Sequence, residues 1–596
     1  MVLVLGISGL DRAQAVKREL LPGLDSRELR LVQGLDSAAA LVGEDGVLAA
    51  SAQERHDGDK GTGAFPVDAI AACLRMAGVT PDEVDVVAHG FRYEPSAAFE
   101  RDALTRRWFR EVYAEEVQRE VLREHFPGRD WERKLVRVPH HLAHAASAYW
   151  LSGFDEATVL VADGMGETEA TSVHAGAGSG LRTLRRYPIG VSLGILYSVV
   201  TQYLGFLPGM DEYKVMGLAP YGDPARFAAA DGELMRRLPD GVLRSPLLAH
   251  DRTPLERETH RGVIRRLEEL FGPARHPQAP LEQRHMDVAA TVQRALEESL
   301  LHVLRAAREL PGGGSRRLCM AGGVALNCTA NGVIARSGLV DEMFVQPASG
   351  DDGSALGAAL WELRRRRPAA PRAMTMPYWG EGFGPGEIAA ALAGLGPGFE
   401  VRSALARDEL LARVSALLGG GSVVSWFQGR MEFGPRALGH RSILADPRVP
   451  GMRAHLNAVV KQREEFRPFA PAVTAERAGE FFEIAPGQEG LYRHMLCVAQ
   501  VREKYREVLP SITHVDGSAR VQVVDRAQSP LFWELIRRFG DDHGTPVVLN
   551  TSFNLRGQPI VRTPREAVET FARSSLDALA IGDVLVTRAR AEGGGR

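Results

Sequence analysis

The sequence predicts an α/β protein, because three segments share one order of features: an apolar strand, a turn rich in glycine, and then polar or helix-forming residues. These segments lie at residues 157–167, 317–331 and 343–363. In α/β folds such a turn directs backbone N–H groups, and the positive end of a helix dipole, towards an anion. The chain of 596 residues is long enough for several domains. We therefore expect a nucleotide-binding ATPase domain built around these segments.

The composition is that of a water-soluble globular protein, with 45% hydrophobic and 25% charged residues. A formal net charge of -3 disfavours a protein that coats nucleic acid or an anionic membrane. The four cysteines form no CxxC pair, which indicates a reducing compartment. Residues 1–8 predict a buried strand and not a signal peptide, and no segment reaches the ~18 apolar residues of a membrane span. We expect a cytoplasmic protein without nucleic-acid or membrane partners.

Periodicity and turn residues predict the other elements of the first half. They are a surface excursion at residues 9–33, a hairpin at 34–54, a helix at 66–77, a strand at 84–89, salt-bridged exposed helices at 97–126 and a helix at 191–203. Asp36 lies near the start of the hairpin, and Gly194 lies within the last helix. Asp211, Glu212 and Lys214 follow that helix closely.

A candidate metal site begins with His140 and His144, in an alanine-rich segment with strong helix propensity. Four residues apart on a helix, the two imidazoles lie on one face and can share one ion. Asp163 ends the strand of the first segment, and Asp351 or Asp352 lies at the turn of the third. Imidazole combined with hard oxygen ligands suits Fe(II), Mn(II) or Zn(II). The alternative is that both histidines are ordinary residues at the start of a helix.

A domain boundary is predicted where four arginines, at 364–367, precede a proline-containing linker, which gives domains 1–367 and 368–596. In the second domain, eight Lys or Arg and four acids lie between Trp426 and Arg467, interleaved with Gly, Pro and aromatic residues. Such neighbours hold guanidinium groups in fixed positions, as a small phosphate-binding pocket requires. The alternative is a structural network of salt bridges.

Ten motifs, spread in order along nearly the whole chain, carry a resemblance to a known family. They are DSAAALV, HHLAHAASAY, DGMGE, DEYKVMGLAPYG, AGGVALN, SGDDGSALGAA, GRMEFGPRALGHRSILADPR, KxRExFRPFAP, HVDGSARVQ and LNTSFN. The chain resembles the NodU/CmcH-type carbamoyltransferases, the O-carbamoyltransferases of antibiotics and nodulation factors. The resemblance implies an N-terminal domain of the actin-like ATPase type, related to threonylcarbamoyl transferases. It also implies a C-terminal YrdC-like α/β domain.

The resemblance also implies the chemistry. Carbamoyl phosphate is cleaved in the second domain, and ATP converts the carbamate to carbamoyl-adenylate. A hydroxyl of a natural product then accepts the carbamoyl group in the first domain, in secondary metabolism such as antibiotic biosynthesis. The implied cofactors are ATP and a divalent metal, with Fe(II) expected and Mn, Zn or Mg as alternatives. The implied partners are carbamoyl phosphate and a hydroxylated small molecule; a homodimer is compatible with the sequence.

Site residues follow from the motifs position by position. The implied metal ligands are His140, His144, Asp163 and one of the pair Asp351/Asp352, with Asp352 preferred because it directly precedes the glycine and the helix. The implied nucleotide-binding residues are Gly194, Lys214, Gly322, Gly323 and Asn327. The implied carbamoyl-phosphate residues are Arg436, Lys461, Arg467, Arg520, Asn550 and Ser552. Asp36, Lys461 and Arg436 are the implied catalytic residues.

The chain departs from many family members at Leu35, where they have a histidine that is a candidate base. Asp36, Asp211 or Glu212 could orient the acceptor hydroxyl instead, or no strong base is needed. Two other functions are alternatives: a tRNA threonylcarbamoyl transferase and a nucleotide-sensing scaffold without catalysis. The net charge and the second, anion-binding domain disfavour the first alternative. The complete set of candidate ligands disfavours the second.

Overall fold

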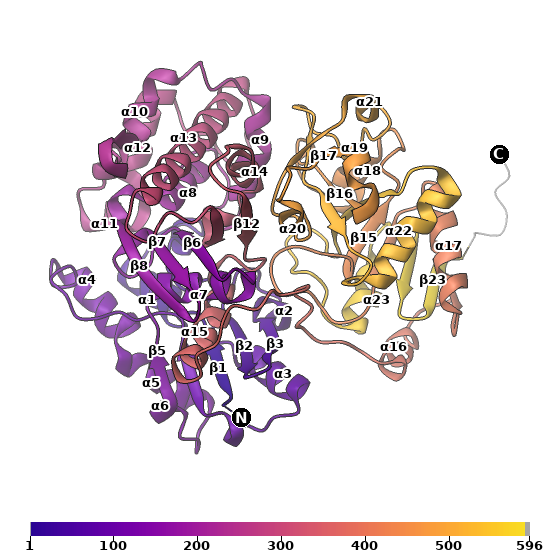
Figure 1. The fold of residues 1–596 in the computed structure, drawn as a ribbon, viewed down its shortest axis with the longest axis horizontal. Coiled ribbons are helices and arrows are strands. Elements are labelled where there is room, and N and C mark those ends of the chain that lie inside the picture. The colour runs from indigo at the N-terminus through magenta and orange to yellow at the C-terminus, as the bar shows by residue number, and fades with distance from the viewer. Residues whose placement is uncertain (1, 590–596) are drawn as a thin grey trace. The chain divides into compact units, whose positions relative to one another are not determined.

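The computed structural model describes residues 2–589, and the chain divides into two compact units (Figure 1). The first unit comprises Met1–Glu54 and Gly61–Met374, and the second comprises Arg55–Lys60 and Thr375–Arg596. The short early segment Arg55–Lys60 thus belongs to the second unit, although its neighbours on both sides belong to the first. The assignment of distinct functions to residues 1–367 and 368–596 stays a prediction.

The first unit contains two five-stranded sheets with the same topology, in the orders β3-β2-β1-β4-β5 and β12-β11-β6-β7-β8. In each, the first three strands along the chain are antiparallel neighbours, and the last two run parallel to the first. The strands of the first sheet are β1 (Val4–Ile7), β2 (Ala38–Gly43), β3 (Gly46–Ala52), β4 (Val86–His89) and β5 (Leu135–Arg137). Those of the second are β6 (Glu156–Ala162), β7 (Glu169–Ala177), β8 (Gly180–Pro188), β11 (Arg317–Ala321) and β12 (Glu342–Val345). The first unit therefore contains an internal structural repeat, with one copy of the topology in each sheet.

Two helices occupy equivalent places in the two repeats. α7 (His140–Ser152) follows β5, and α15 (Asp351–Arg366) follows β12. α15 packs on β1 and β2, α7 packs on β6 and β11, and the two helices pack against each other, as Figure 1 shows. A Cβ atom on Gly357 would lie 1.8 Å from the carbonyl oxygen of Ala143, so only glycine permits this approach. The helix pair thereby joins the two sheets.

The remaining elements of the first unit surround this core. They include the helices α1 (Ala13–Leu20), α3 (Val67–Ala77), α4 (Ala103–Trp108), the π-helix η3 (Phe109–Tyr113), α5 (Glu115–His125), α6 (Trp131–Lys134), α8 (Leu193–Tyr203), α9 (Glu212–Leu218), α10 (Asp231–Leu234), α11 (Pro254–Thr259), α12 (Arg261–Phe271), α13 (Gln283–Arg308) and α14 (Cys328–Arg336). Two short strands, β9 (Arg236–Leu238) and β10 (Val242–Arg244), form a separate pair. The predicted hairpin, the strand at 84–89 and the helices at 66–77 and 191–203 are confirmed. Among the described residues, no helix combines the length and the apolar character needed to cross a membrane.

The prediction of a surface excursion at residues 9–33 is wrong in part, because α1 lies within it and packs inwards. Val16 joins a cluster that includes Phe91 and Trp108. Lys17 is fully buried, and its ammonium donates hydrogen bonds to the carbonyl oxygens of Leu31 and Glu258. A buried amine of this kind is not visible in a polar, arginine-rich sequence, since its carbonyl partners carry no side-chain signal.

The second unit is built on an eight-stranded mixed sheet with the order β13-β23-β22-β14-β15-β21-β16-β20. Its strands are β13 (Phe399–Arg402), β14 (Val424–Phe427), β15 (Arg441–Ala445), β16 (Ala470–Thr474), β20 (Gln522–Val524), β21 (Val547–Ser552), β22 (Ala578–Ile581) and β23 (Val584–Arg588). α17 (Arg407–Gly419) and α22 (Pro530–His543) cover the sheet, and their core includes Trp426, Leu535 and Phe539. A smaller sheet joins β17 (Phe482–Glu483), β18 (Ala499–Val501) and β19 (Ser518–Ala519).

We expect Gly357→Ala to destabilise the first unit by on the order of 1–3 kcal/mol, because the added methyl group overlaps the Ala143 carbonyl and must push α15 away from α7. Thermal unfolding followed by circular dichroism would measure the loss. Gly232→Ala is the matched control, since nothing lies within 4 Å of the added atom and α10 gains a better helix former. An unchanged melting temperature for Gly357→Ala would show that the two helices do not constrain each other.

Candidate metal centre and anion-binding loops

The centre of the first unit is an imidazole pair on α7. His140 opens the helix after Pro139, and the alanine-rich sequence continues it. The Nε2 atoms of His140 and His144 lie 3.0 Å apart, and both side chains are completely buried. The Nδ1 atom of His140 lies 2.9 Å from the carbonyl oxygen of Gly90. Nδ1 is therefore held by a backbone carbonyl oxygen, and Nε2 is the nitrogen that faces the cluster.

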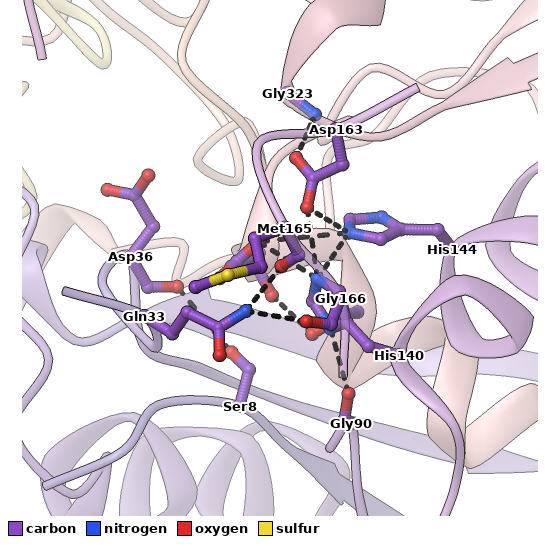
Figure 2. Close-up of polar contacts among 12 residues, drawn as sticks. Ser8, Gln33, Asp36, Gly90, His140, His144, Asp163, Met165, Gly166 and Gly323 are labelled. Carbon is purple, nitrogen blue, oxygen red and sulfur yellow. Dashed lines mark hydrogen bonds and ion pairs between the residues drawn. The ribbon is translucent and has the colours of Figure 1, made fainter. Parts of the chain in front are cut away.

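Two carboxylates complete this cluster (Figure 2). Asp163, which follows β6, has its Oδ2 3.3 Å from the His140 Nε2 and 4.0 Å from the His144 Nε2. The Oδ1 of Asp351, at the start of α15, lies 3.3 and 3.7 Å from the same two nitrogens. One ligand atom from each residue lies within 4.8 Å of all the others. Four mutually facing donor atoms of imidazole and carboxylate type fit a divalent cation at their centre.

The electrostatics of the cluster agree with this arrangement. Burial alone raises the pKa of a carboxyl group, yet the hydrogen bond and charge of His140 hold the pKa of Asp163 below its usual value. Burial likewise opposes ionisation of Asp351, and the charge of His140 reverses it, so that the pKa of Asp351 is also lowered. Both acids are thus stabilised as anions by positive charge on the adjacent imidazoles, and an ionised carboxylate is the form that binds a cation. That ligation of a metal occurs here stays a prediction.

The sequence favoured Asp352 as the fourth metal ligand. The geometry favours Asp351 instead. Successive helical residues point about 100° apart, so only one of the two faces α7. The Asp352 carboxylate turns to the backbone, where its Oδ1 accepts the N–H of Gly353 at 2.9 Å. Asp352, next to the glycine, therefore binds the backbone at the start of α15, whereas Asp351 faces the imidazoles.

Glu167 and Gln33 hold the cluster in place, and sequence reasoning missed both. Glu167 accepts the backbone N–H of His140 at 2.9 Å and that of Arg92 at 2.7 Å. It thereby caps the start of α7 from another part of the chain. Gln33 donates from Nε2 to the carbonyl oxygen of Gly166 at 3.0 Å and also to that of Met165 (Figure 2). Glu167 stands in the DGMGE motif and could have been suspected, whereas nothing near Gln33 signals a partner 133 residues away.

The glycine turn after β11 lies directly beside the candidate metal cluster. β11 is parallel to β6, so their carboxyl ends adjoin. The N–H of Gly323 donates to Oδ1 of Asp163 at 2.9 Å, while the other oxygen of Asp163 faces the imidazoles. Gly322 has φ +89°, and a Cβ there would lie 2.3 Å from the Ala162 carbonyl oxygen. The structure thus brings the predicted nucleotide turn and the predicted metal ligand together through one carboxylate.

The other predicted nucleotide residues have different surroundings. Gly194 packs on the turn that contains Asp163, since its Cβ would lie 2.6 Å from the carbonyl oxygen of that residue. Asn327 caps α14 by accepting the N–H of Ala330 at 2.9 Å. Lys214 forms an ion pair with Asp211 at 3.0 Å. Gly194 therefore belongs to the wall of the site, whereas the described contacts of Asn327 and Lys214 are structural.

Asp36 adopts a left-handed backbone conformation, with φ +56°, which is costly for a residue other than glycine. Burial, followed by the charges of Glu54, Asp352 and Asp351, raises the pKa of Asp36 well above its usual value. Oδ2 of Asp36 and Oδ1 of Asp352 would lie 3.8 and 3.3 Å from a Cβ atom on Gly350, so the Asp36 side chain lies near the start of α15. Strain of this kind concentrates at functional sites, which agrees with the role predicted for Asp36.

In the second unit, four predicted anion-binding motifs meet at one edge of the sheet. Their positions follow from the strand register, because Asn550 at the end of β21 pairs with Leu444 on β15 and with Ala470 at the start of β16. The loops before β15, β16 and β20 and the end of β21 therefore adjoin. The Asn550 side chain ties three of these motifs, since it donates to the Gln522 side chain at 2.8 Å and to the carbonyl oxygen of Ala437 at 3.3 Å.

Lys461 is buried, and its ammonium points at the end of β21. It donates to the carbonyl oxygen of Asn554 and to that residue's Oδ1, each at 2.9 Å, and also to the carbonyl oxygen of Ser552. The Ser552 hydroxyl in turn donates to the Asn554 Oδ1 at 2.7 Å. Burial, and then the charges of Arg463, Arg467 and Lys60, lower the pKa of Lys461. Lys461 thus anchors the loop after β21, and its cationic neighbours are Arg463, Arg467 and Lys60.

The predicted arginines of the second unit lie on the same loops. Arg436 stands in the turn before β15, which Glu432 closes by accepting the N–H groups of Leu438 at 2.7 Å and His440 at 2.9 Å. Arg467 pairs loosely with Glu464, at 3.5 Å. Arg520 lies in the connection from β19 to β20. The sequence identified these cations, but not Glu432, which shapes the turn around one of them.

Comparison with known proteins places this architecture in a family. The profile described as "Carbamoyltransferase N-terminus" matches residues 32–360, and that described as "Carbamoyltransferase C-terminus" matches residues 415–588. The chain belongs to the carbamoyltransferase family. It is therefore an enzyme that transfers carbamoyl groups, as the ten motifs predicted.

Several relatives align over much of the chain. Nodulation protein NolNO of Sinorhizobium fredii is 39% identical, over 93% of this chain and 79% of its own length. An uncharacterised protein of Synechocystis is also 39% identical, over 93% of this chain and 95% of its own length. The 3'-hydroxymethylcephem-O-carbamoyltransferase of Amycolatopsis lactamdurans is 35% identical, over 64% of this chain and 65% of its own length.

We expect Asp351→Asn to lose bound metal and Asp352→Asn to retain it, because only Asp351 faces both imidazoles. The loss in affinity for Asp351→Asn should exceed the ~10–100-fold that outer-shell changes typically cost. His144→Ala should lose metal similarly. Elemental analysis of the purified proteins after dialysis would measure this. Equal metal content in the two aspartate variants would contradict the assignment.

Proposed function

We propose that the protein is an ATP-dependent O-carbamoyltransferase that uses carbamoyl phosphate and a hydroxylated small molecule of secondary metabolism. The observation that carries the proposal is the shared carboxylate of Asp163, which links the imidazole pair to the Gly323 turn. A metal-binding cluster joined to a candidate phosphate-binding turn is the arrangement that activation by a nucleotide requires. The cationic loops of the second unit supply a separate place for a phosphorylated substrate.

The first unit, in this proposal, is of the actin-like ATPase type, and the second is YrdC-like. The repeated five-stranded topology supports the first assignment, since the turns that follow β6 and β11 come from adjacent parallel strands. Ligands of open α/β sheets bind outside the carboxyl ends of such strands. The gathering of four loops at one edge of the eight-stranded sheet supports the second assignment.

Carbamoyl phosphate would bind among the cations around Lys461. A buried ammonium with Arg463 and Arg467 beside it is a position where an anion relieves repulsion. Arg436 and Arg467 would contact the phosphate, and Lys461 would hold the loop after β21 in place. Fixed guanidinium groups stabilise the charge that grows on a departing phosphate. Water would cleave carbamoyl phosphate to carbamate and phosphate. ATP would then convert the carbamate into carbamoyl-adenylate with release of pyrophosphate, and AMP is a better leaving group than hydroxide.

His140, His144, Asp163 and Asp351 would hold the divalent ion. Fe(II) is proposed, with Mn, Zn or Mg as alternatives, and bound there it would serve as a Lewis acid. Asp36 would orient the acceptor hydroxyl and take its proton. The side chain of Leu35 cannot form a hydrogen bond, so the carboxylate of Asp36 is the adjacent polar side chain at the start of the DSAAALV motif. The named cephem relative acts on a hydroxymethyl group, which supports a hydroxyl as acceptor.

A tRNA-modifying activity is less well supported. Residues 415–588 match the profile described as "Carbamoyltransferase C-terminus", which favours carbamoyl transfer. The formal net charge of -3 also gives no general attraction for a polyanion. Steep salt dependence of tRNA binding would reverse this preference.

The proposal predicts that the two sites fail separately. With labelled carbamoyl phosphate and ATP, Arg436→Ala should lower the formation of carbamoyl-adenylate by roughly 10²–10³-fold, as the loss of one fixed donor does, while its metal content stays normal. His144→Ala should lose metal yet still bind carbamoyl phosphate. Arg565→Ala, at a surface pair with 84% exposure of the arginine, is the control and should behave as wild type. Wild-type protein that neither binds nor cleaves carbamoyl phosphate would refute the proposal.

A second prediction concerns the acceptor step. Asp36→Asn should slow transfer to a hydroxylated acceptor by roughly 10²–10⁴-fold, the usual contribution of a general base. Release of pyrophosphate from ATP in a single turnover should remain. An acceptor is first found by mass spectrometry with a panel of hydroxylated natural products. Normal transfer by Asp36→Asn would exclude this residue, and Leu35→His tests whether a histidine at the neighbouring position adds to the rate.

A further inference from the structure

The loop Lys461–Arg467 of the second unit has an irregular and demanding backbone. It begins where α18 (Met452–His455) continues into the π-helix η10 (Leu456–Val460), and the N–H of Lys461 donates to the carbonyl oxygen of Leu456 at 2.8 Å. Gln462, directly after it, has φ +46°. Single π-turns often occur at functional sites, and a left-handed backbone persists only where neighbours enforce it. Something must therefore hold this loop.

Asn457 is the residue that holds it. Its side chain is 1% exposed, and it makes hydrogen bonds to three points of the loop. Nδ2 donates to the carbonyl oxygens of Arg467 at 3.1 Å and Glu465 at 3.3 Å. Oδ1 accepts from Nε of Arg463 at 2.6 Å, and the Arg463 N–H donates to the Asn457 carbonyl oxygen at 2.9 Å. Both amide hydrogens and the amide oxygen are thus engaged with alternate residues of one loop.

These contacts act on the spacing of positive charges. Arg463 and Arg467 are the cations whose charges lower the pKa of Lys461 most strongly after burial. Arg463 also stacks over the ring of Phe469, with its guanidinium carbon 4.4 Å from the ring centre. Arg463, Arg467 and Lys461 carry like charges within seven residues of one loop, and their repulsion favours a wider loop unless hydrogen bonds such as those of Asn457 oppose it. Only an uncharged side chain that both donates and accepts, as an amide does, can make all three contacts.

We propose that Asn457 is a positioning residue, which sets the spacing of Arg463 and Arg467 and thereby the affinity of the second unit for a phosphorylated substrate. The role rests on the proposed function, since it concerns the same anion site. Asn457 is buried, and its side-chain hydrogen bonds go to the loop, so it would act on a substrate through the loop. It acts by fixing where the guanidinium groups lie before the anion arrives, so that binding requires little ordering.

The test uses Asn457→Asp in the full-length protein. The carboxylate has nearly the same shape and still accepts from Arg463, but it cannot donate, and it faces the Glu465 and Arg467 carbonyl oxygens with negative charge. We expect the dissociation constant for carbamoyl phosphate, and for inorganic phosphate as a second probe, to rise about tenfold or more, as loss of a buried hydrogen-bonded partner implies. The KM for carbamoyl phosphate should rise correspondingly, with kcat largely retained.

Ser415→Ala is the matched control. This buried side chain in the same unit donates one hydrogen bond, to Oδ2 of Asp542 at 2.6 Å, on helices away from the loop. It should lower stability without changing either dissociation constant. If Asn457→Asp does not fold, Asn457→Ala replaces it, with hydrogen exchange as the readout: faster exchange confined to residues 461–467 is expected.

The outcomes separate this inference from the proposed function. Wild-type affinity for both anions in the folded Asn457 variant would overturn the positioning role alone. A parallel loss of affinity in Ser415→Ala would also overturn it, because general destabilisation would then explain the effect. Wild-type protein that binds no carbamoyl phosphate would overturn the proposed function itself.

Discussion

The close contact between α7 and α15 is the constraint on which the first unit depends. Each helix follows the last strand of its own sheet, so the contact joins two structural repeats. Gly357 allows the backbones to approach, and the approach brings Asp351 to the imidazoles of His140 and His144. The candidate metal site therefore draws on both repeats: α7 supplies the imidazoles, and α15 supplies the carboxylate of Asp351. Neither half could assemble the cluster alone.

The sequence predicted the elements of this site better than their connections. A hairpin, several strands and the His140–His144 register are local properties, because periodicity and spacing determine them. The choice between Asp351 and Asp352 is not local, since it depends on which side of α15 meets α7. Lys461 shows the same limit. Its charge and its neighbours led to the prediction of an anion site, but its ammonium donates hydrogen bonds to backbone carbonyl oxygens that no sequence pattern indicates.

The two units use opposite strategies for charge. In the first, carboxylates and imidazoles converge in an arrangement that fits a cation. In the second, buried and half-buried cations converge, and buried amides such as Asn550 and Asn457 fix the loops that carry them. Uncharged donors and acceptors are suited to this task, because they hold backbone oxygens without cancelling the positive charge of the loops.

The membership of Arg55–Lys60 in the second unit has a practical consequence. Arg55 donates to the carbonyl oxygen of Gly434, and Arg562 donates to the carbonyl oxygen of Arg55, at 3.1 and 3.2 Å. The covalent chain therefore passes between the units three times, after residues 54, 60 and 374. A fragment that begins at Thr375 would lack Arg55, the buried hydrogen-bond donor to Gly434, so a single cut yields no complete second unit. Gene fusions or split versions of this enzyme must carry the early segment with the late one.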